Sequence, residues 1–328
     1  MRQGTNVRTL RYLALLAVFV CAWGARAAEV DWPTRPVTMI APFPPGGTVD
    51  IVARTIGQRL TNELGKPFVV DNKSGAGGTI GTNAVAHAAP DGHTFLVNHM
   101  GLAFDAALYS KLPYDTSRDI VPVAYVGATP NVLVVTNKFP AKSVEEFMKL
   151  ARSQPGAIAY GSGGVGSAGH LPMELLQSET GLKLEHVPYK GNGPALVDLI
   201  SGQIQVMLAT IPAVIPYIKS GQLRPLATSG SHRSGALPNL PTLDESGIKG
   251  FDYQPWYGIF APAGTPPAIL DKMHDAVNKV LSDPEIATKL GQQGLEVQVL
   301  SRAQFTDIVR ADITKWTALI AKLGIKAN

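Results

Sequence analysis

The sequence predicts an α/β protein with two lobes, each containing a mixed, mostly parallel sheet. Strand-like and helix-like segments alternate along nearly all of the 328 residues, which is typical of layered α/β domains. About 300 residues remain after a short leader, and chains of that size usually divide into two domains. Two β-rich pieces within 121–136, broken by Gly127 and Pro130, are placed to carry the chain from one lobe into the other.

The first 27 residues have the three parts of a secretory signal. Arg2, Arg8 and Arg11 precede a short apolar run at 13–23, and Ala25-Arg26-Ala27 offers small residues for cleavage. An uncleaved anchor is the alternative, but the run is short for a hydrocarbon core of ~30 Å. We therefore predict a periplasmic protein cleaved near Ala27.

The charge balance changes once the leader is removed. The whole chain carries 29 Lys plus Arg against 25 Asp plus Glu, a net charge of +4. Four of the arginines and none of the acids lie in 1–27, so 25 of each sign remain. No basic patch is left to indicate nucleic-acid binding. Cys21 is the sole cysteine and lies in the leader, which excludes disulfides from the mature protein.

The first lobe is expected to comprise residues 28–127 and 233–328. Strands are predicted at 37–40, 68–70 and 94–97, with a helix over 49–64 whose apolar residues recur at helical spacing. Gly65 is a typical helix stop. The returning chain is expected to form a strand at 256–260 and helices at 269–281, 284–290 and 304–323.

The second lobe is expected to comprise residues 128–232. Ser143 and Glu146 predict a capping box for a helix over 144–153. The remaining predicted elements are strands at 158–160, 185–187, 206–208 and 226–227, a helix at 172–179 and a helix starting near Pro194.

Two glycine-rich loops of the first lobe follow strands and precede helices. In the first, Phe43, Pro44, Gly46, Gly47 and Thr48 lead into the helix, whose unpaired N–H groups suit a carboxylate or phosphate. An ordinary tight turn is the alternative. The second loop contains Gly77, Gly78 and Thr79 and is typical of a backbone nest. It matches neither a dinucleotide fingerprint nor a P-loop, and a purely structural turn remains open.

A third loop, 161–166, matches G-x-G-x-x-G between a strand and a helix. Nicotinamide cofactors are scarce outside the cytoplasm, so we prefer a carboxylate site made by backbone N–H groups and hydroxyls. The predicted ligand contacts here are Ser162, Gly163, Gly166, Ser167 and His170, although a core or capping role for His170 is also open.

Two further segments contribute candidates. Tyr189 ends a strand and offers an apolar wall with a polar tip, while packing in the core is the alternative. Asn98 follows the third strand, and the adjacent His99 and Met100 are hypothesised to reshape the pocket toward a larger or less polar carboxylate.

The sequence shows no catalytic constellation. Neither Ser162 nor Ser167 lies in G-x-S-x-G, and the seven histidines have no metal-binding spacing. We therefore predict no catalytic residues, no metal and no cofactor.

Eight phrases resemble the solute-binding receptors of tripartite tricarboxylate transporters, the Bug-type family. They run in order along nearly the whole mature chain: 44–50 with Arg54, 70–78, 90–94, 112–115, 160–170, 187–191, 241–247 and 261–266. One such phrase would be a weak signal, whereas eight in order are specific.

The resemblance implies a type II periplasmic binding fold whose two lobes close on a ligand. It also implies that loop N–H groups, hydroxyls and waters hold the ligand carboxylate. The expected ligand is a small di- or tricarboxylate, acidic amino acid or aromatic acid. We expect a monomer that passes its ligand to transporter membrane subunits. Sensing for a membrane kinase is an alternative, and an exported enzyme is a more remote one.

Overall fold

The computed structural model describes residues 30–327. The chain divides after Trp32 into two units, and the description below concerns the unit that begins at Pro33. The expected signal peptide, residues 1–27 with cleavage near Ala27, lies outside the described residues. No helix in the described part of the chain is both long and apolar enough to cross a membrane.

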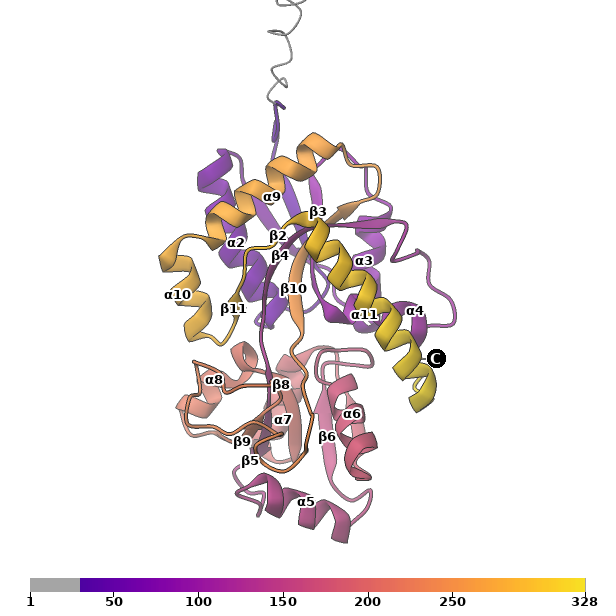
Figure 1. Ribbon diagram of the computed structural model, residues 1–328, viewed down its shortest axis with the longest axis vertical. Helices are drawn as coiled ribbons and strands as arrows, with labels where there is room; N and C mark the ends of the chain where they lie inside the picture. Colours follow the sequence, from indigo (N-terminus) through magenta and orange to yellow (C-terminus); the bar gives the residue numbers. More distant parts are fainter. Residues whose placement is uncertain (1–29, 328) are drawn as a thin grey trace, which may run out of the picture. The chain divides into compact units, whose positions relative to one another are not determined.

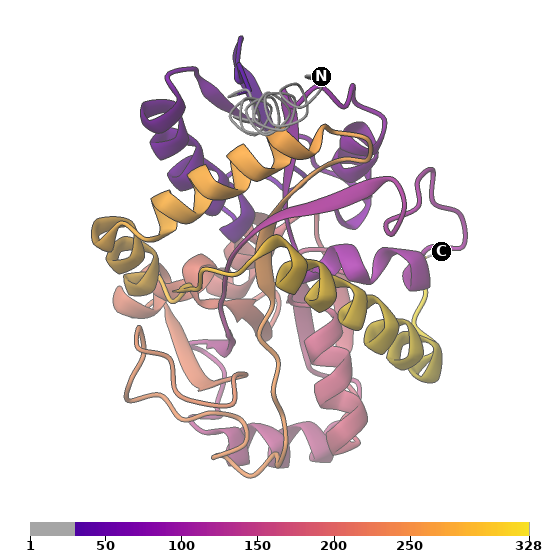
Figure 2. The same ribbon diagram turned by 45° about the horizontal axis from the view of Figure 1, so that its top comes forward.

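The first lobe is built on a six-stranded mixed sheet. Its strand order is β11(Glu296–Val297), β4(Ile120–Ala128), β10(Trp256–Pro262), β3(Thr94–His99), β1(Val37–Ala41) and β2(Phe68–Asn72). The pairs β1–β2 and β1–β3 are parallel, whereas β10 is antiparallel to β3 and β4. Its helical elements are α2(Thr48–Leu64), η1(Ala76–Gly78), α3(Thr79–Ala86), η2(Met100–Ala103), α4(Asp105–Leu108), α9(Pro267–Leu281), α10(Pro284–Gln292) and α11(Arg302–Leu323). Helices α9 and α11 both pack against β4 and lie over this sheet (Figure 2).

The second lobe is built on a five-stranded mixed sheet (Figure 1). Its strand order is β7(Glu185–Pro188), β6(Ala159–Ser162), β8(Val206–Thr210), β5(Asn131–Thr136) and β9(Leu223–Thr228). Its helices are α5(Val144–Ser153), α6(Leu171–Thr180), α7(Asn192–Ser201) and α8(Ile211–Lys219). Helix α8 has no counterpart among the predicted elements, and it contains Pro212 and Pro216 although proline disfavours a helix interior. Pro212 lies in the first turn, where its missing N–H costs nothing.

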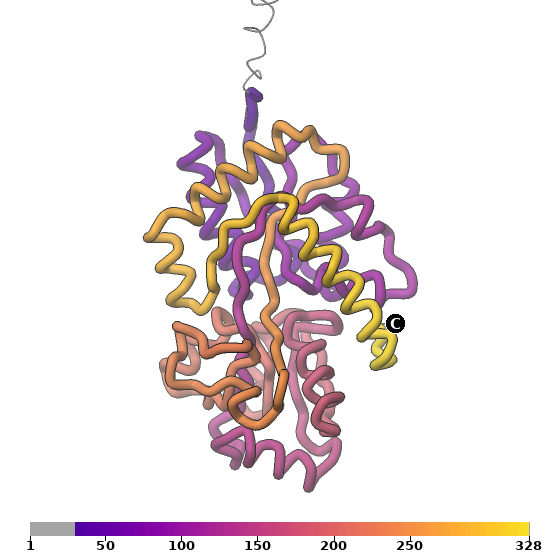
Figure 3. Tube along the Cα trace, in the orientation of Figure 1, coloured from indigo at the N-terminus to yellow at the C-terminus, as the bar shows by residue number. Residues whose placement is uncertain are grey.

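Two stretches of chain connect the lobes. Residues Thr129 and Pro130 lead from β4 into β5, and residues 229–255 return from β9 to β10. The two connections run side by side between the lobes, where the N–H of Thr129 donates to the carbonyl of Pro255 at 3.2 Å (Figure 3).

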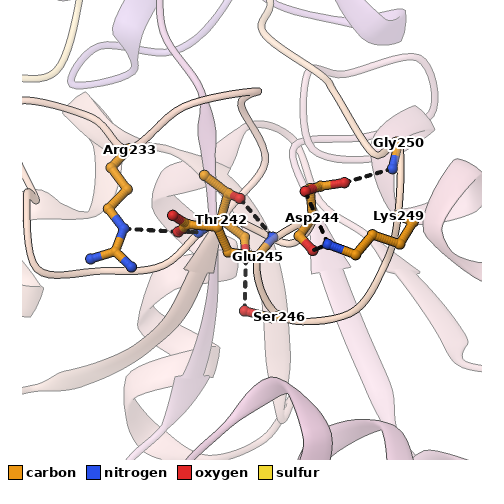
Figure 4. Close-up of polar contacts among 7 residues, drawn as sticks. All are labelled: Arg233, Thr242, Asp244, Glu245, Ser246, Lys249 and Gly250. Atoms are coloured by element: carbon orange, nitrogen blue, oxygen red, sulfur yellow. Dashed lines mark hydrogen bonds and ion pairs between the residues drawn. The ribbon is translucent and has the colours of Figure 1, made fainter.

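The return segment has no regular secondary structure but is well bonded. The N–H of Ser229 donates to the carbonyl of Asn131 in β5 at 2.8 Å. Further along, Thr242 and Glu245 exchange reciprocal hydrogen bonds, and the guanidinium of Arg233 donates to the Glu245 carboxylate at 2.8 Å (Figure 4). These bonds give a long loop a defined course along the second lobe.

Burial on both faces explains why residues 132–135 of β5 are all apolar. All six of its residues are buried. Val132 and Val134 pack in a cluster with α7 and α8, whereas Leu133 and Val135 belong to a separate core cluster. Successive side chains of a strand point to opposite faces, so the middle of a strand covered on both sides is apolar, and the polar residues Asn131 and Thr136 stand at the two ends of β5.

The predicted helix boundaries are confirmed where capping signals are strong. Helix α2 ends at Gly65, which adopts φ 70°, a left-handed conformation that suits glycine. Helix α5 spans Val144–Ser153, and the hydroxyl of Ser143 accepts a hydrogen bond from the N–H of Glu146 at 3.1 Å. The Glu146 carboxylate accepts from the N–H of Lys142 and not from that of Ser143, so the capping box is shifted by one residue.

Candidate functional site

A small space, the inner chamber, lies where elements of both lobes meet. Its volume is about 40 Å³, enough for a carboxylate group or a few water molecules. It is lined by Phe43, Pro44, Pro45, Gly47, Thr48, Val49, His99, Gly163, Ser167, Ala168, Gly191, Asn192, Gly193, Thr210 and Tyr257.

Three helix N-termini converge on the inner chamber. The N-cap residues Gly47 of α2, Gly191 of α7 and Thr210 of α8 all line it. None of the three helices has a side-chain capping hydrogen bond. Each therefore directs the positive end of its dipole toward one small space, which favours an anion. Helices α2 and α7 also offer first-turn N–H groups, whereas in α8 the N–H of Ile211 donates to the carbonyl of Pro130 and Pro212 has no N–H.

The side chains around the inner chamber are neutral. Its described lining contains no Asp, Glu, Lys or Arg, and its polar side chains are hydroxyls, Asn192 and His99. Ser167 is 4% exposed, and its hydroxyl has no hydrogen-bond partner among residues 30–327. A buried hydroxyl without a partner is costly, so a ligand acceptor would complete it.

Three hydroxyl groups join the lobes at this point. Thr48 begins α2 in the first lobe, Thr210 ends β8 in the second, and their hydroxyl oxygens lie 2.7 Å apart. Tyr257 of β10 also hydrogen-bonds to both. Burial raises the pKa of Tyr257, and these two bonds only partly oppose the rise. The cleft is therefore closed by a direct, uncharged contact between the lobes.

A larger space, the outer chamber, continues the cleft and holds about 380 Å³. It shares Phe43, Pro44, Gly163 and Gly191 with the inner chamber. Its other lining residues are Ser74, Gly75, Ala76, Gly77, Gly78, Tyr109, Gly164, Val165, Pro188, Tyr189, Lys190 and Ala327. Among the described residues, Lys190 is the only charged side chain lining either chamber. A ligand whose carboxylate occupies the inner chamber could thus extend past Phe43 and Pro44 into the outer one.

The structure brings nine of the predicted site residues to the cleft. Those lining the inner chamber are Phe43, Pro44, Gly47, Thr48, Gly163 and Ser167, and Gly77, Gly78 and Tyr189 line the outer one. The Tyr189 hydroxyl donates to Asp198 at 2.6 Å, which fixes its ring at the wall.

The other six predicted residues line neither chamber and make hydrogen bonds within the protein. In the first lobe, the N–H of Gly46 donates to Asp50 at 3.0 Å, and the Thr79 hydroxyl donates to the carbonyl of Ala76 at 2.9 Å. The Asn98 side chain accepts from the N–H of His99 at 2.8 Å. Their roles as ligand contacts stay predictions.

In the second lobe, Ser162, Gly166 and His170 shape the third glycine-rich loop. The Ser162 hydroxyl lies 2.7 Å from Nε2 of His186, and the N–H of Gly166 donates to Nδ1 of His170 at 3.3 Å. The two imidazole rings stack with centroids 4.3 Å apart. Burial lowers the pKa of His170 to about 3 and that of His186 to about 4, so both rings are neutral at neutral pH.

The Ser162–His186 pair has the spacing of a nucleophile and its base, but Ser162 is 0% exposed and lines neither chamber. The described residues also contain no group of three or more His, Cys, Asp or Glu positioned to hold a metal.

Asp50 and Arg54, which belong to the first of the eight family-like segments, form an ion pair. The Asp50 carboxylate lies 2.9 Å from the guanidinium of Arg54, one helical turn away, and accepts from Asn72 at 3.0 Å. Burial raises the pKa of Asp50, but hydrogen bonds from Arg54, Gly46 and Asn72 outweigh it and hold the pKa below its usual value. The pair therefore supports the first loop from behind.

Sequence reasoning missed several residues of the inner chamber. Asn192 and Gly193 follow the phrase that contains Tyr189, and Thr210 ends a strand directly before Ile211-Pro212. Both places are junctions between a strand and a helix. Examining every such junction would have found them, because strand ends and helix starts meet at one edge of a sheet.

Comparisons with known proteins indicate the family of the chain. The family model described as "Tripartite tricarboxylate transporter family receptor" matches residues 52–325. The protein BugT of Bordetella pertussis (strain Tohama I) is 37% identical over 320 residues, covering 96% of this chain and 98% of its own.

Solved structures agree over the same span. An R. palustris protein with adipate has a TM-score of 0.86 at 36% identity, covering 90% of this chain and 99% of its own. Periplasmic binding protein BugD has a TM-score of 0.86 at 34% identity, covering 90% of this chain and 99% of its own. MatC from Rhodopseudomonas palustris with bound malate has a TM-score of 0.84 at 34% identity, covering 88% of this chain and 100% of its own.

These matches confirm the resemblance drawn from the eight phrases and the two-lobed type II periplasmic binding fold. The family model and the curated relative both span most of the chain, from the first lobe through the second and back. The chain therefore belongs to the tripartite tricarboxylate transporter family of receptors.

Proposed function

We propose that this protein is a periplasmic receptor that captures a small carboxylate between its lobes and passes it to transporter membrane subunits. The observation that carries the proposal is the convergence of three uncapped helix N-termini on a chamber without charged side chains. Such a site favours one anionic group and needs no arginine.

The relatives support the carboxylate class. Adipate and malate are the ligands named for two solved structures of similar fold. Both are dicarboxylates, and one carboxylate of such a ligand would fit the inner chamber here. Its remainder would lie in the outer chamber, where Lys190 offers a positive charge.

The two connections between the lobes provide the route for opening. We propose a first lobe on the β1–β4, β10 and β11 sheet, a second lobe on the β5–β9 sheet, and bending at 129–130 and 229–255. A ligand that contacts both lobes binds the closed form better and shifts the population toward it. Transporter subunits could then distinguish loaded from empty receptor by shape.

A thermal-shift screen tests the binding proposal. The protein lacking residues 1–27 is refolded to remove co-purified ligand and then screened against about a hundred small carboxylates and their amides. A ligand that binds only the folded state raises the melting temperature by mass action. We expect at least one carboxylate to give a shift that its amide does not give. A folded sample that responds to none of the acids would refute carboxylate capture.

An uptake experiment tests the transporter role. Cells lacking this protein should lose uptake of the acid found in the screen, and the full chain should restore it. Uptake that continues unchanged, together with loss of a kinase-dependent response to the same acid, would favour the sensing alternative.

A further inference from the structure

His99 presents one ring nitrogen to the protein and leaves the other without a partner. Its Nδ1 accepts a hydrogen bond from the backbone N–H of Gly101 at 2.7 Å. A nitrogen that accepts this bond carries no proton, so the neutral ring must hold its proton on Nε2. None of the hydrogen bonds among residues 30–327 involves Nε2. The tautomer is thus fixed by the chain's own backbone, and Nε2 can only donate.

The ring is held in place at the wall of the inner chamber. It stacks on Phe43 with ring centroids 4.9 Å apart and an interplanar angle of 27°, and Tyr257 lies on another side at 6.0 Å. His99 is 4% exposed, and burial lowers its pKa to about 4. At neutral pH the ring is therefore an uncharged donor in a fixed position.

The other groups around the chamber also favour acceptors in the ligand. The N-termini of α2 and α7 supply N–H groups, and Ser167 has a free hydroxyl. No carboxylate side chain of the described residues lines either chamber. A buried ammonium group needs acceptors or a counter-charge to repay its desolvation, and the lining of this cleft offers hydroxyl and amide oxygens but no counter-charge.

We infer that the cleft selects carboxylates that lack an ammonium group, and that His99 is a specificity-determining residue that disfavours amino acids. The inference rests on the proposed carboxylate receptor function and narrows its ligand class. An ammonium beside Nε2–H would face a donor that cannot turn into an acceptor, because Gly101 holds the tautomer. A hydrogen, hydroxyl or carbonyl at the same place meets no such conflict.

Matched ligand pairs test the inference on the unmodified protein. Affinities are measured by calorimetry for succinate and aspartate, glutarate and glutamate, adipate and 2-aminoadipate, and the best acid of the screen with its 2-amino analogue. Within each pair only the ammonium group differs. We expect the amino acid to bind at least tenfold more weakly than its partner. Equal or tighter binding of the amino acid would overturn the inference while leaving the receptor function standing, whereas no binding by any acid would refute both.

Two variants assign the selectivity to His99. His99→Gln can present an amide oxygen as an acceptor, so the preference for the acid over its amino analogue should shrink at least threefold. His99→Phe keeps an aromatic ring against Phe43 but loses the donor, so it should weaken binding of the acid. His87→Gln, at an exposed histidine that lines neither chamber, is the matched control and should leave the ratio unchanged.

Thermal unfolding shows whether each variant is folded. The ligand pairs measured on the unmodified protein decide the ligand class whatever the variants show. A folded His99→Gln protein that keeps the full preference would remove His99 from the specificity role.

Discussion

Ser167 and Ser162 lie five residues apart, yet their hydroxyls differ in hydrogen bonding. Ser167 lines the inner chamber, and its buried hydroxyl has no hydrogen-bond partner among the described residues. The Ser162 hydroxyl accepts from the N–H of Gly164 at 3.1 Å and lies 2.7 Å from His186. The first is thus available to a ligand, whereas the second is used to hold the loop.

This difference predicts that substituting Ser167 changes ligand affinity, whereas substituting Ser162 changes the stability of the fold. Ser167→Ala should weaken carboxylate binding roughly tenfold or more, the scale of a hydrogen bond to a charged group. The same change should leave the free energy of unfolding unaltered or raise it, because it removes an unsatisfied buried group. Calorimetry and urea unfolding measure the two quantities.

Ser162→Ala is the matched comparison. It should lower the free energy of unfolding by about 1 kcal/mol through its lost hydrogen bonds. A Ser167→Ala protein with unchanged affinity and a Ser162→Ala protein with unchanged stability would contradict this assignment of roles.

At the scale of elements, the short helix α4 contains a buried acid. Asp105 is 4% exposed and accepts a hydrogen bond from the Tyr114 hydroxyl at 2.6 Å. Burial raises its pKa from 3.8 to about 7, and the bond from Tyr114 only partly opposes the rise. No counter-charge is paired with it among the ion pairs of residues 30–327.

The raised pKa predicts a specific pH dependence of stability. Between about pH 4 and pH 7 the folded protein keeps a proton on Asp105 that the unfolded chain has lost, so stability falls as pH rises through this range. The contribution is at most about 1.4 kcal/mol for each pH unit. Asp105→Asn keeps an acceptor for Tyr114 and should remove this fall.

Urea unfolding of both proteins at several pH values across that range measures the effect. The difference between wild type and Asp105→Asn isolates this carboxyl from other titrating groups. A difference that does not change with pH would show that Asp105 is ionised in the folded protein throughout.

At the scale of the whole molecule, closure depends on small residues where the lobes touch. Gly77 of the first lobe has φ 64°, and a Cβ placed there would lie 2.6 Å from the carbonyl oxygen of Val165 in the second lobe. Real Cβ atoms do not approach an oxygen so closely, so a larger residue would hold the lobes apart. Gly65 has a similar φ of 70°, with nothing within 4 Å of the same position.

Substituting each of these two glycines by alanine provides a controlled test of closure. Gly77→Ala should weaken ligand binding at least tenfold, because a ligand that contacts both lobes must then bind a more open cleft. Gly65→Ala introduces a comparable backbone strain of roughly 1–2 kcal/mol and should leave affinity unchanged. Calorimetry gives the affinities, and small-angle scattering with and without ligand reports closure. Equal affinities for the two variants would show that the Gly77–Val165 contact does not limit closure.

The sequence by itself determined the α/β class, helices such as α2 and α5, and the three glycine-rich loops that contribute residues to the two chambers. These features depend on local physics: apolar periodicity, capping residues and glycines at strand ends act within a few residues of one another. The eight family phrases, read together, gave the two-lobed fold and the receptor class.

Only the tertiary structure decided which residues of those loops line the inner and outer chambers. Ser162 and Ser167 both had to be predicted as contacts, because their loop carries no sign of which hydroxyl pairs with a distant histidine. Thr210 and Asn192 reach the inner chamber because strands far apart in sequence end at one edge, and the Thr48–Thr210 contact exists only where two lobes meet. Side-chain direction and contact between lobes depend on packing across the whole fold, and no local pattern encodes them.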